Sequence, residues 1–208
     1  TRGINRYADD KLTDLGLKYD AGFPLYLRGM WEDSAARVWI GYQGESGIGR
    51  IEKPGSVKRI GDRELPNGAT DFASDSAGNV WIATEEGLLK YKDDREIERY
   101  TLKEGLRNDK IIAVHVDRED SVWLGTYDGL SCLKNGKVVN FADVEKSPKG
   151  FVREIYEDAE GVLWFGTYGD GLVRYKDGAF FNFRVEDGLF NNGVFAIEED
   201  KRGNFWIS

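Results

Sequence analysis

The sequence has few of the residues on which covalent frameworks and metal chemistry depend. Its 208 residues include one cysteine, one histidine and four prolines. Cys132 has no partner for an intrachain disulfide, so we expect a packed core thiol. A single histidine, His115, excludes histidine-rich zinc sites. No apolar run reaches the roughly 18–20 residues that a membrane-spanning helix needs. We therefore expect no metal site, no cofactor and no membrane span in this chain.

Positively charged residues are also outnumbered by negatively charged ones. Lys and Arg number 29 against 37 Asp and Glu, which gives a formal net charge of −8. An acidic chain gains little from releasing counterions on a phosphate backbone, so nucleic acid is not an expected partner. The sequence starts at Thr1 rather than Met and shows no basic leader followed by an apolar stretch. It therefore reads as a processed or excised segment whose targeting signal is not visible.

Glycine, by contrast, is abundant, with 26 residues, and aromatic residues make up 13% of the chain. Many glycines together with few prolines indicate tight turns rather than linkers. Aromatic and β-branched residues between such turns are typical of short strands. The composition thus favours an all-β protein.

Tryptophan shows an internal repeat. Five of the six tryptophans are spaced 42, 42, 41 and 42 residues apart: Trp39, Trp81, Trp123, Trp164 and Trp206. An aspartate lies six residues before each of them: Asp33, Asp75, Asp117, Asp158 and Asp200. We expect the tryptophans to fill the space between repeats. We expect the aspartates to accept backbone N–H groups in the turn that follows them.

Each repeat reads as four short antiparallel strands. An apolar run such as residues 111–116 is followed by a turn, the Trp strand, a glycine turn, a third strand, an Asn-Gly or Asp-Gly hairpin and an outer strand. Four strands in about 42 residues make one blade of a β-propeller. A solenoid of parallel coils is the alternative, although its repeat is usually shorter.

The two ends of the chain continue the pattern. Written end to end, residues 206–208 and 1–7 read WIS-TRGINRY, which parallels WIATEEGLLKY at residues 81–91. We therefore predict a single domain over residues 1–208, a five-bladed β-propeller of four-stranded antiparallel blades. N- and C-terminal strands would share one blade and close the ring, which removes exposed sheet edges. A segment cut from a larger ring at a whole number of repeats is the alternative.

A candidate binding site lies where the variable loops of a propeller meet, on the face that carries the turns after the Trp strands. We select residues that could converge at the mouth of the central channel and bind a small polar ligand such as a carbohydrate: Arg28, Asp71, Tyr127, Asp128, Arg153, Glu154, Tyr168 and Asp170. Tyrosine faces cover the C–H surfaces of sugars, and charged side chains match hydroxyl or carboxylate groups. The alternative is that Arg28 and Arg153 neutralise Asp71 and Glu154 in a wet channel.

No catalytic constellation is visible, so we expect a non-enzymatic protein. His115 lies in an inner strand and reads as channel-lining or packed. Asp128 and Asp170 could form a glycosidase pair, although such pairs are common in acidic propellers.

A third reading is a protein-interaction scaffold. It would use aromatic residues as a docking surface: Phe23, Trp31, Phe151 and Phe190.

The repeat resembles the two-component regulator propeller family. The matching residues are Glu157-Asp158, the strand at residues 163–167, Gly171-Leu172, Arg174-Tyr175 and the loop at residues 187–189. Residues 123–126, 129–130 and 104–106 match in the same way. The resemblance implies a periplasmic sensor module of bacterial signalling proteins, often ahead of a histidine kinase or nucleotide cyclase and often linked to carbohydrate sensing.

Two features depart from that family. Its sensors are usually larger rings with more repeats, and no signalling segment is visible in this sequence. Streptogramin lyase propellers are a poorer match, because they rely on a catalytic histidine. The resemblance therefore bears more directly on fold than on function.

Overall fold

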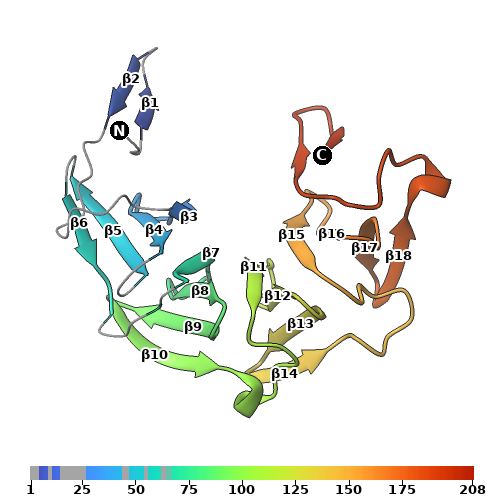
Figure 1. The fold of residues 1–208 in the computed structure, drawn as a ribbon, viewed down its shortest axis with the longest axis horizontal. Helices are drawn as coiled ribbons and strands as arrows, with labels where there is room; N and C mark the ends of the chain where they lie inside the picture. Colours follow the sequence, from blue (N-terminus) through green and yellow to red (C-terminus); the bar gives the residue numbers. More distant parts are fainter. Residues whose placement is uncertain are drawn as a thin grey trace.

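A computed structural model describes residues 5–8, 11–14, 27–43, 47–53, 56–61, 65 and 67–208. Its sheets are arranged like the blades of a fan, with β3, β7, β11 and β15 nearest the centre (Figure 1). Each blade is antiparallel and runs outward in chain order from its innermost strand. The predicted all-β propeller of four-stranded blades is confirmed.

Four blades are complete. Blade 1 holds β3 (Leu27–Glu32), β4 (Val38–Tyr42), β5 (Ile48–Lys53) and β6 (Ser56–Arg59). Blade 2 holds β7 (Ala69–Ser74), β8 (Val80–Thr84), β9 (Gly87–Lys92) and β10 (Arg95–Tyr100). Blade 3 holds β11 (Ile111–Val116), β12 (Val122–Thr126), β13 (Gly129–Lys134) and β14 (Lys137–Asn140). Blade 4 holds β15 (Val152–Glu157), β16 (Leu163–Thr167), β17 (Leu172–Lys176) and β18 (Ala179–Phe183).

Two hairpins complete the strands of the described chain. They are β1 (Asn5–Ala8) with β2 (Lys11–Asp14), and β19 (Ile197–Glu199) with β20 (Phe205–Ile207). They lie at the two ends of the arc in Figure 1 and form separate two-stranded sheets. Residues 1–4 of the predicted junction lie outside the described residues. The shared closing blade and the count of five therefore remain predictions.

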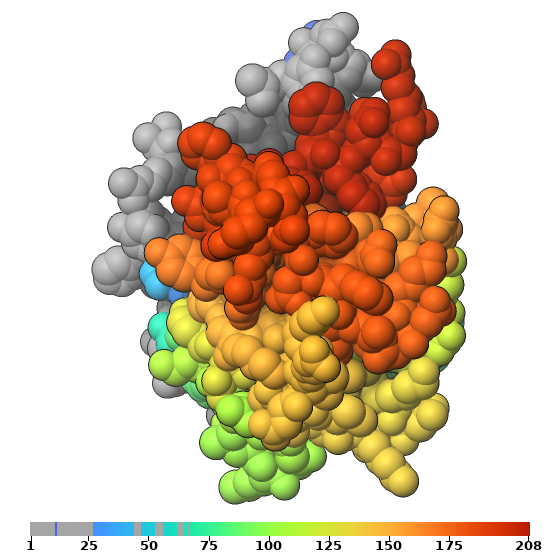
Figure 2. All heavy atoms as spheres, turned by 90° about the vertical axis from the view of Figure 1, so that its right-hand side faces the viewer, coloured from blue at the N-terminus to red at the C-terminus, as the bar shows by residue number. Residues whose placement is uncertain are grey.

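Helix is confined to two short 3₁₀ turns, η1 (Leu102–Glu104) and η2 (Val185–Asp187), within the described ranges. No helix in those ranges is long and apolar enough to cross a bilayer. Figure 2 faces the side where blade 4, in orange, lies between blade 3, in yellow, and the C-terminal hairpin, in red. The blades are thus stacked side by side.

Most of the hydrophobic core of the described residues lies between blades, although Ile40 and Tyr42 cluster with residues of their own blade. One cluster joins Trp39 of blade 1 to Phe72 and Leu89 of blade 2. A second joins blades 2 and 3, and a third packs Trp123 of blade 3 against Phe165 of blade 4. Antiparallel blades whose two faces are both covered need apolar residues on both faces. This explains why strands such as VWIAT and VWLGT are buried along their whole length.

The fixed spacing of six residues between aspartate and tryptophan has a direct cause. One carboxylate oxygen accepts backbone N–H groups of the turn, as expected: Asp117 Oδ1 accepts from Glu119 N at 2.9 Å and Ser121 N at 2.8 Å. The other oxygen accepts the indole Nε1–H of the tryptophan. The five distances in chain order, from Asp33–Trp39 to Asp200–Trp206, are 2.9, 3.1, 2.8, 2.9 and 3.3 Å.

The tryptophans differ in burial. Trp39, Trp81 and Trp123 are 1%, 4% and 5% exposed, whereas Trp206 on β20 is 67% exposed. Trp164 is half-buried. Burial therefore follows the number of neighbouring strands that cover each ring among the described residues.

Each inner strand of the four complete blades begins with a β-bulge. The pairing register shifts by one residue at Arg28, Thr70, Ile112 and Arg153. A bulge leaves one residue without a partner and re-aims its side chain. The residues that the repeat aligned near the predicted channel mouth are therefore the bulged residues of the inner strands.

Candidate functional site

The turn after each Trp strand is tied to the loop that leads into the next blade. Tyr127 N donates to Lys110 O at 3.2 Å, and Tyr168 N donates to Phe151 O at 2.9 Å. Tyr168 also forms an isolated β-bridge with Gly193. The turn after a Trp strand and the loop into the next inner strand therefore lie together on one face. We call this surface the upper face.

Two tyrosines stand exposed on the upper face. Tyr127 is 44% exposed and packs edge-on against Phe151, with ring centroids 4.7 Å apart. Tyr168, one blade further on, is 69% exposed and packs against Phe195 at 6.0 Å in the same T-shaped manner. Each tyrosine is thus held by a second ring from the following loop, which orients it while its own surface stays open.

A cation accompanies each of these aromatic pairs. Lys110 Nζ lies 5.6 Å from the centroid of Tyr127. The Arg153 guanidinium lies 5.6 Å from the centroid of Phe195. Lys110 and Phe195 were not among the selected site residues. Phe195 does occupy the repeat position of Arg28 and Arg153, and this was the signal that could have identified it.

Asp71 on β7 is held by the backbone. Its Oδ1 accepts from Phe72 N at 2.8 Å, and its Oδ2 accepts from Val114 N of the next inner strand at 2.9 Å. Burial raises the pKa of this carboxyl to about 6, although the two backbone hydrogen bonds oppose the rise. Asp71 therefore joins the inner strands of blades 2 and 3.

The side-chain carboxyl of Glu154 on β15 has no hydrogen bond to any described residue. Burial, followed by the nearby carboxylates of Asp71 and Glu198, raises its pKa to about 7, and Arg153 works in the opposite direction. The channel side thus brings together three of the predicted site residues: Asp71, Arg153 and Glu154. Glu198 is a further member that the sequence did not single out.

Arg28 does not join this group. Its Nη2 pairs with Glu85 of blade 2 at 2.8 Å. The alternative in which both arginines neutralise Asp71 and Glu154 is therefore wrong for Arg28. Of the two arginines, Arg153 is the one that lowers the pKa of Glu154 among the described residues.

The remaining two predicted residues are occupied in ion pairs near their own loops. Asp128 accepts from Arg107 Nε at 2.8 Å. Asp170 accepts from Arg184 Nη2 at 3.0 Å and from Lys149 N at 2.9 Å. These contacts order the rim of the upper face.

His115 lies in an ion-pair network between two blades, and Cys132 is buried in the core. His115 Nε2 lies 3.3 Å from Glu157 Oε2 on the next blade, and Arg118 Nε donates to the other oxygen of Glu157 at 2.6 Å. Cys132 is 3% exposed, and burial raises the pKa of its thiol to about 12. In the part of the chain that the structure describes, no three His, Cys, Asp or Glu side chains are grouped to hold a metal ion. Phe23 lies outside the described residues.

The sequence and the fold were compared with known proteins. Residues 146–169 and 188–208 match the family described as two component regulator propeller. Histidine kinase P4 of Formosa agariphila is 28% identical over 148 residues, which covers 62% of this chain and 10% of the kinase. The chain therefore spans about a tenth of that relative.

Two solved structures show the same architecture. The extracellular domain of the hybrid two component system BT3049 from B. thetaiotaomicron gives a TM-score of 0.85 at 22% identity, over 99% of this chain and 30% of that domain. Virginiamycin B lyase from Staphylococcus aureus gives 0.70 at 17% identity, over 87% of this chain and 62% of the lyase. At these identities the likeness concerns the fold alone.

The matched segments contain Glu157-Asp158, the strand at residues 163–167 and Gly188-Leu189, on which the sequence resemblance rested in part. The predicted resemblance is confirmed. The chain thus has a β-propeller fold, and two of its segments match the two-component regulator propeller repeat.

Proposed function

We propose that this propeller is a non-enzymatic sensor module of a bacterial extracytoplasmic signalling protein, and that its upper face binds a small polar ligand such as a carbohydrate at the channel mouth. The observation that carries the proposal is the pair of exposed tyrosines, Tyr127 and Tyr168, each fixed by a second ring. Fixed aromatic faces lose little conformational entropy when a ligand stacks on them.

The charged groups supply the polar half of such a site. Arg153 stands beside Glu154, whose carboxyl has no hydrogen bond to a described residue. Both can bond to ligand hydroxyl groups, and the guanidinium can donate to two oxygens side by side. Asp128 and Asp170 hold the rim through their arginine partners and are assigned no direct contact.

The signalling context rests on the relatives. The matched kinase is a histidine kinase, and the solved hybrid system contributes an extracellular domain. A propeller in that setting detects a ligand and passes the change in its loops to the rest of the protein. Partner domains of the signalling protein are therefore proposed neighbours of this chain.

Calorimetry against a panel of neutral and acidic oligosaccharides tests the proposal. Tyr168→Ala and Arg153→Ala should each weaken a binder about tenfold, since a stacked ring or a charge-assisted hydrogen bond contributes on the order of 1–2 kcal/mol. Phe181→Ala, an exposed aromatic on the outer strand β18, is the matched control and should leave affinity unchanged. The absence of any binder, or a binder indifferent to both site variants, would overturn the proposal.

A second candidate is a protein-docking surface. Phe190, in the loop after η2, is fully exposed at 102%. An exposed phenylalanine of this kind is a typical anchor of an interface. If Phe190→Ala weakens capture of a signalling partner while sugar binding is unaffected, docking is the function of that loop.

A further inference from the structure

Three of the four complete blades place a cation over their central tryptophan. The residue opposite the tryptophan on the third strand is basic, namely Arg50, Lys90 and Arg174 in blades 1, 2 and 4. The charged groups lie 5.8, 4.8 and 6.0 Å from the rings of Trp39, Trp81 and Trp164. Blade 3 departs from this pattern, because Cys132 is the residue opposite Trp123.

The arginine of blade 1 also bridges to the next blade. Arg50 Nη1 donates at 2.6 Å to Asp94, which lies in the two-residue turn between β9 and β10. At the junction of blades 3 and 4, the equivalent turn between β17 and β18 is Asp177-Gly178. Asp177 therefore supplies a carboxylate on that turn, at the position of Asp93 rather than of Asp94, while the residue opposite Trp123 carries no guanidinium.

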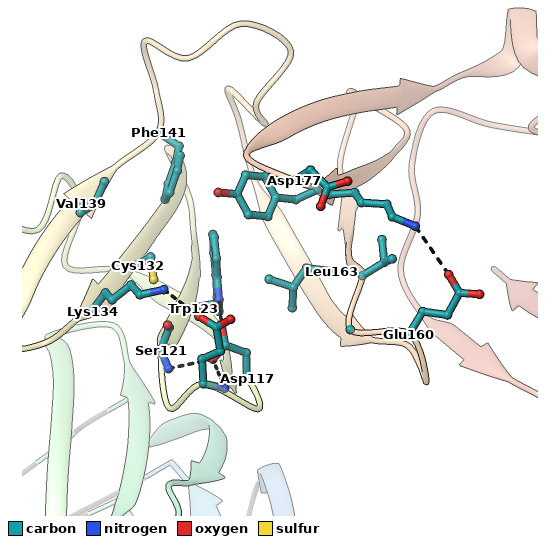
Figure 3. A pocket seen from close by; sticks show the side chains of 15 residues that line it. Asp117, Ser121, Trp123, Cys132, Lys134, Val139, Phe141, Glu160, Leu163 and Asp177 are labelled. Carbon is teal, nitrogen blue, oxygen red and sulfur yellow. Dashed lines mark hydrogen bonds and ion pairs between the residues drawn. The ribbon is translucent and has the colours of Figure 1, made fainter.

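A cavity of about 410 Å³ occupies this junction. Figure 3 shows Trp123, Cys132 and Ser121 of blade 3 on one side and Leu163 and Asp177 of blade 4 on the other. The volume is within the range of small-molecule sites. Its lining comes from the turns opposite the upper face, between first and second and between third and fourth strands, so it is separate from the proposed carbohydrate site.

A buried polar group of the cavity has no partner. Ser121 is 2% exposed, and its Oγ makes no hydrogen bond to a described residue. At the same repeat position Asn79 donates to Asp75 Oδ2 at 2.7 Å, and Arg37 donates to Asp33 Oδ2 at 2.6 Å. A buried hydroxyl without a partner costs free energy unless a ligand or water supplies one.

The charges of the lining leave an excess of carboxylate. Lys134 pairs with Glu119 at 2.9 Å, and Lys176 pairs with Glu160 at 3.6 Å. Asp177 then has no ion pair among the described residues, and Asp117 accepts from Trp123 and the backbone of its turn. The cavity therefore combines an apolar wall with a negative rim.

We propose that this cavity binds an alkylguanidinium or alkylammonium group, which takes the place held by Arg50 in blade 1. The apolar stem lies against Trp123 and Leu163, the charged head meets Asp177, and Ser121 Oγ accepts one of its hydrogen bonds. A free guanidino compound and an arginine side chain of a peptide share this chemistry.

The test compares butylguanidine with butylurea, which has nearly the same shape but no charge. Calorimetry and the indole N–H resonance of Trp123 follow binding. Butylguanidine should bind one to one and shift that resonance, while butylurea should bind about tenfold or more weakly. An arginine-containing tripeptide with blocked ends distinguishes a peptide source from a free small molecule. Equal binding of the two compounds, or no binding of either, overturns the proposal.

Variants locate the binding in this cavity. Cys132→Arg fills the cavity with the group that blades 1 and 4 already carry, so it should fold and should abolish butylguanidine binding. Cys132→Ser leaves the cavity open and is the matched control. Asp177→Asn lies on an exposed turn and should weaken binding about tenfold without changing thermal unfolding. Unchanged binding in both Cys132→Arg and Asp177→Asn contradicts the proposal.

Discussion

The carboxylate of Asp117 accepts the indole N–H of Trp123 at 2.8 Å and two backbone N–H groups of its own turn. This arrangement fixes the turn between the first two strands of a blade to the ring that fills the space between blades. We expect Asp117→Ala to lower the free energy of unfolding by about 2–3 kcal/mol, because it leaves a buried indole donor unsatisfied. Urea denaturation measures the loss.

Asp200 makes the same contact with Trp206 and provides an internal comparison. Trp206 is 67% exposed, so water can replace the lost acceptor. Asp200→Ala should therefore destabilise the protein less than Asp117→Ala. An equal loss at the two positions would contradict the assignment of the energy to burial.

The pH dependence of stability should report on Glu154. Its folded-state pKa is raised to about 7, so between pH 5 and 7 the folded protein binds more protons here than the unfolded chain does. Stability contributed by this group therefore falls as pH rises through that window. Asp71, raised to about 6, acts in the same direction.

Glu154→Gln removes the Glu154 part of this dependence. Unfolding free energies at pH 5 and pH 8 should differ less in the variant than in the parent protein. Glu160→Gln, on an exposed turn, is the control and should follow the parent. Parallel pH profiles for the parent and Glu154→Gln would show that Glu154 is not desolvated.

Gly41 tests the close approach of neighbouring blades. A Cβ at this position would lie 2.0 Å from Ala69 O on the next inner strand. Gly41→Ala should therefore destabilise the protein by about 2–3 kcal/mol through overpacking. Ala83, at the equivalent position of blade 2, already carries a Cβ, so Ala83→Gly should cost only about 0.5–1 kcal/mol. Thermal unfolding of the two variants distinguishes these outcomes.

The Cys132 thiol should be unreactive in the native protein. It is buried, and its pKa is raised to about 12, so little thiolate exists at pH 8. A disulfide reagent should label it slowly without denaturant and rapidly in concentrated urea. Fast native labelling would show that the Cys132 thiol itself is accessible and that burial does not raise its pKa.

Much of the architecture could be predicted because it is repeated. The spacing of Trp39, Trp81 and Trp123 alone defines the blade, and the register fixes which loops share a face. Local turn chemistry also predicted that Asp117 would accept backbone N–H groups. The indole contact was not predicted, although the constant spacing of six residues was its signal.

Side-chain pairing across blades was harder to predict. Arg28 and Glu85 are 57 positions apart, and nothing in the repeat indicates that they meet. The raised pKa of Glu154 reflects burial together with the carboxylates of Asp71 and Glu198, which lie on two other inner strands. The aligned repeats show Cys132 where the other complete blades carry a basic residue opposite the tryptophan. The consequence of this difference depends on where Asp177 of the next blade lies, which the alignment does not give.

Because most of the core lies between blades, the unfolding of one blade depends on its neighbours. Since Trp39 packs against Phe72 of the next blade, and Trp123 against Phe165, the largest clusters of the described residues each span two blades. Stability is then a nearest-neighbour property, as in linear repeat arrays. Amide hydrogen exchange should be slowest in β8 and β12, which have blades on both sides, and fastest in β19 and β20. Loss of one junction would release both blades that share it.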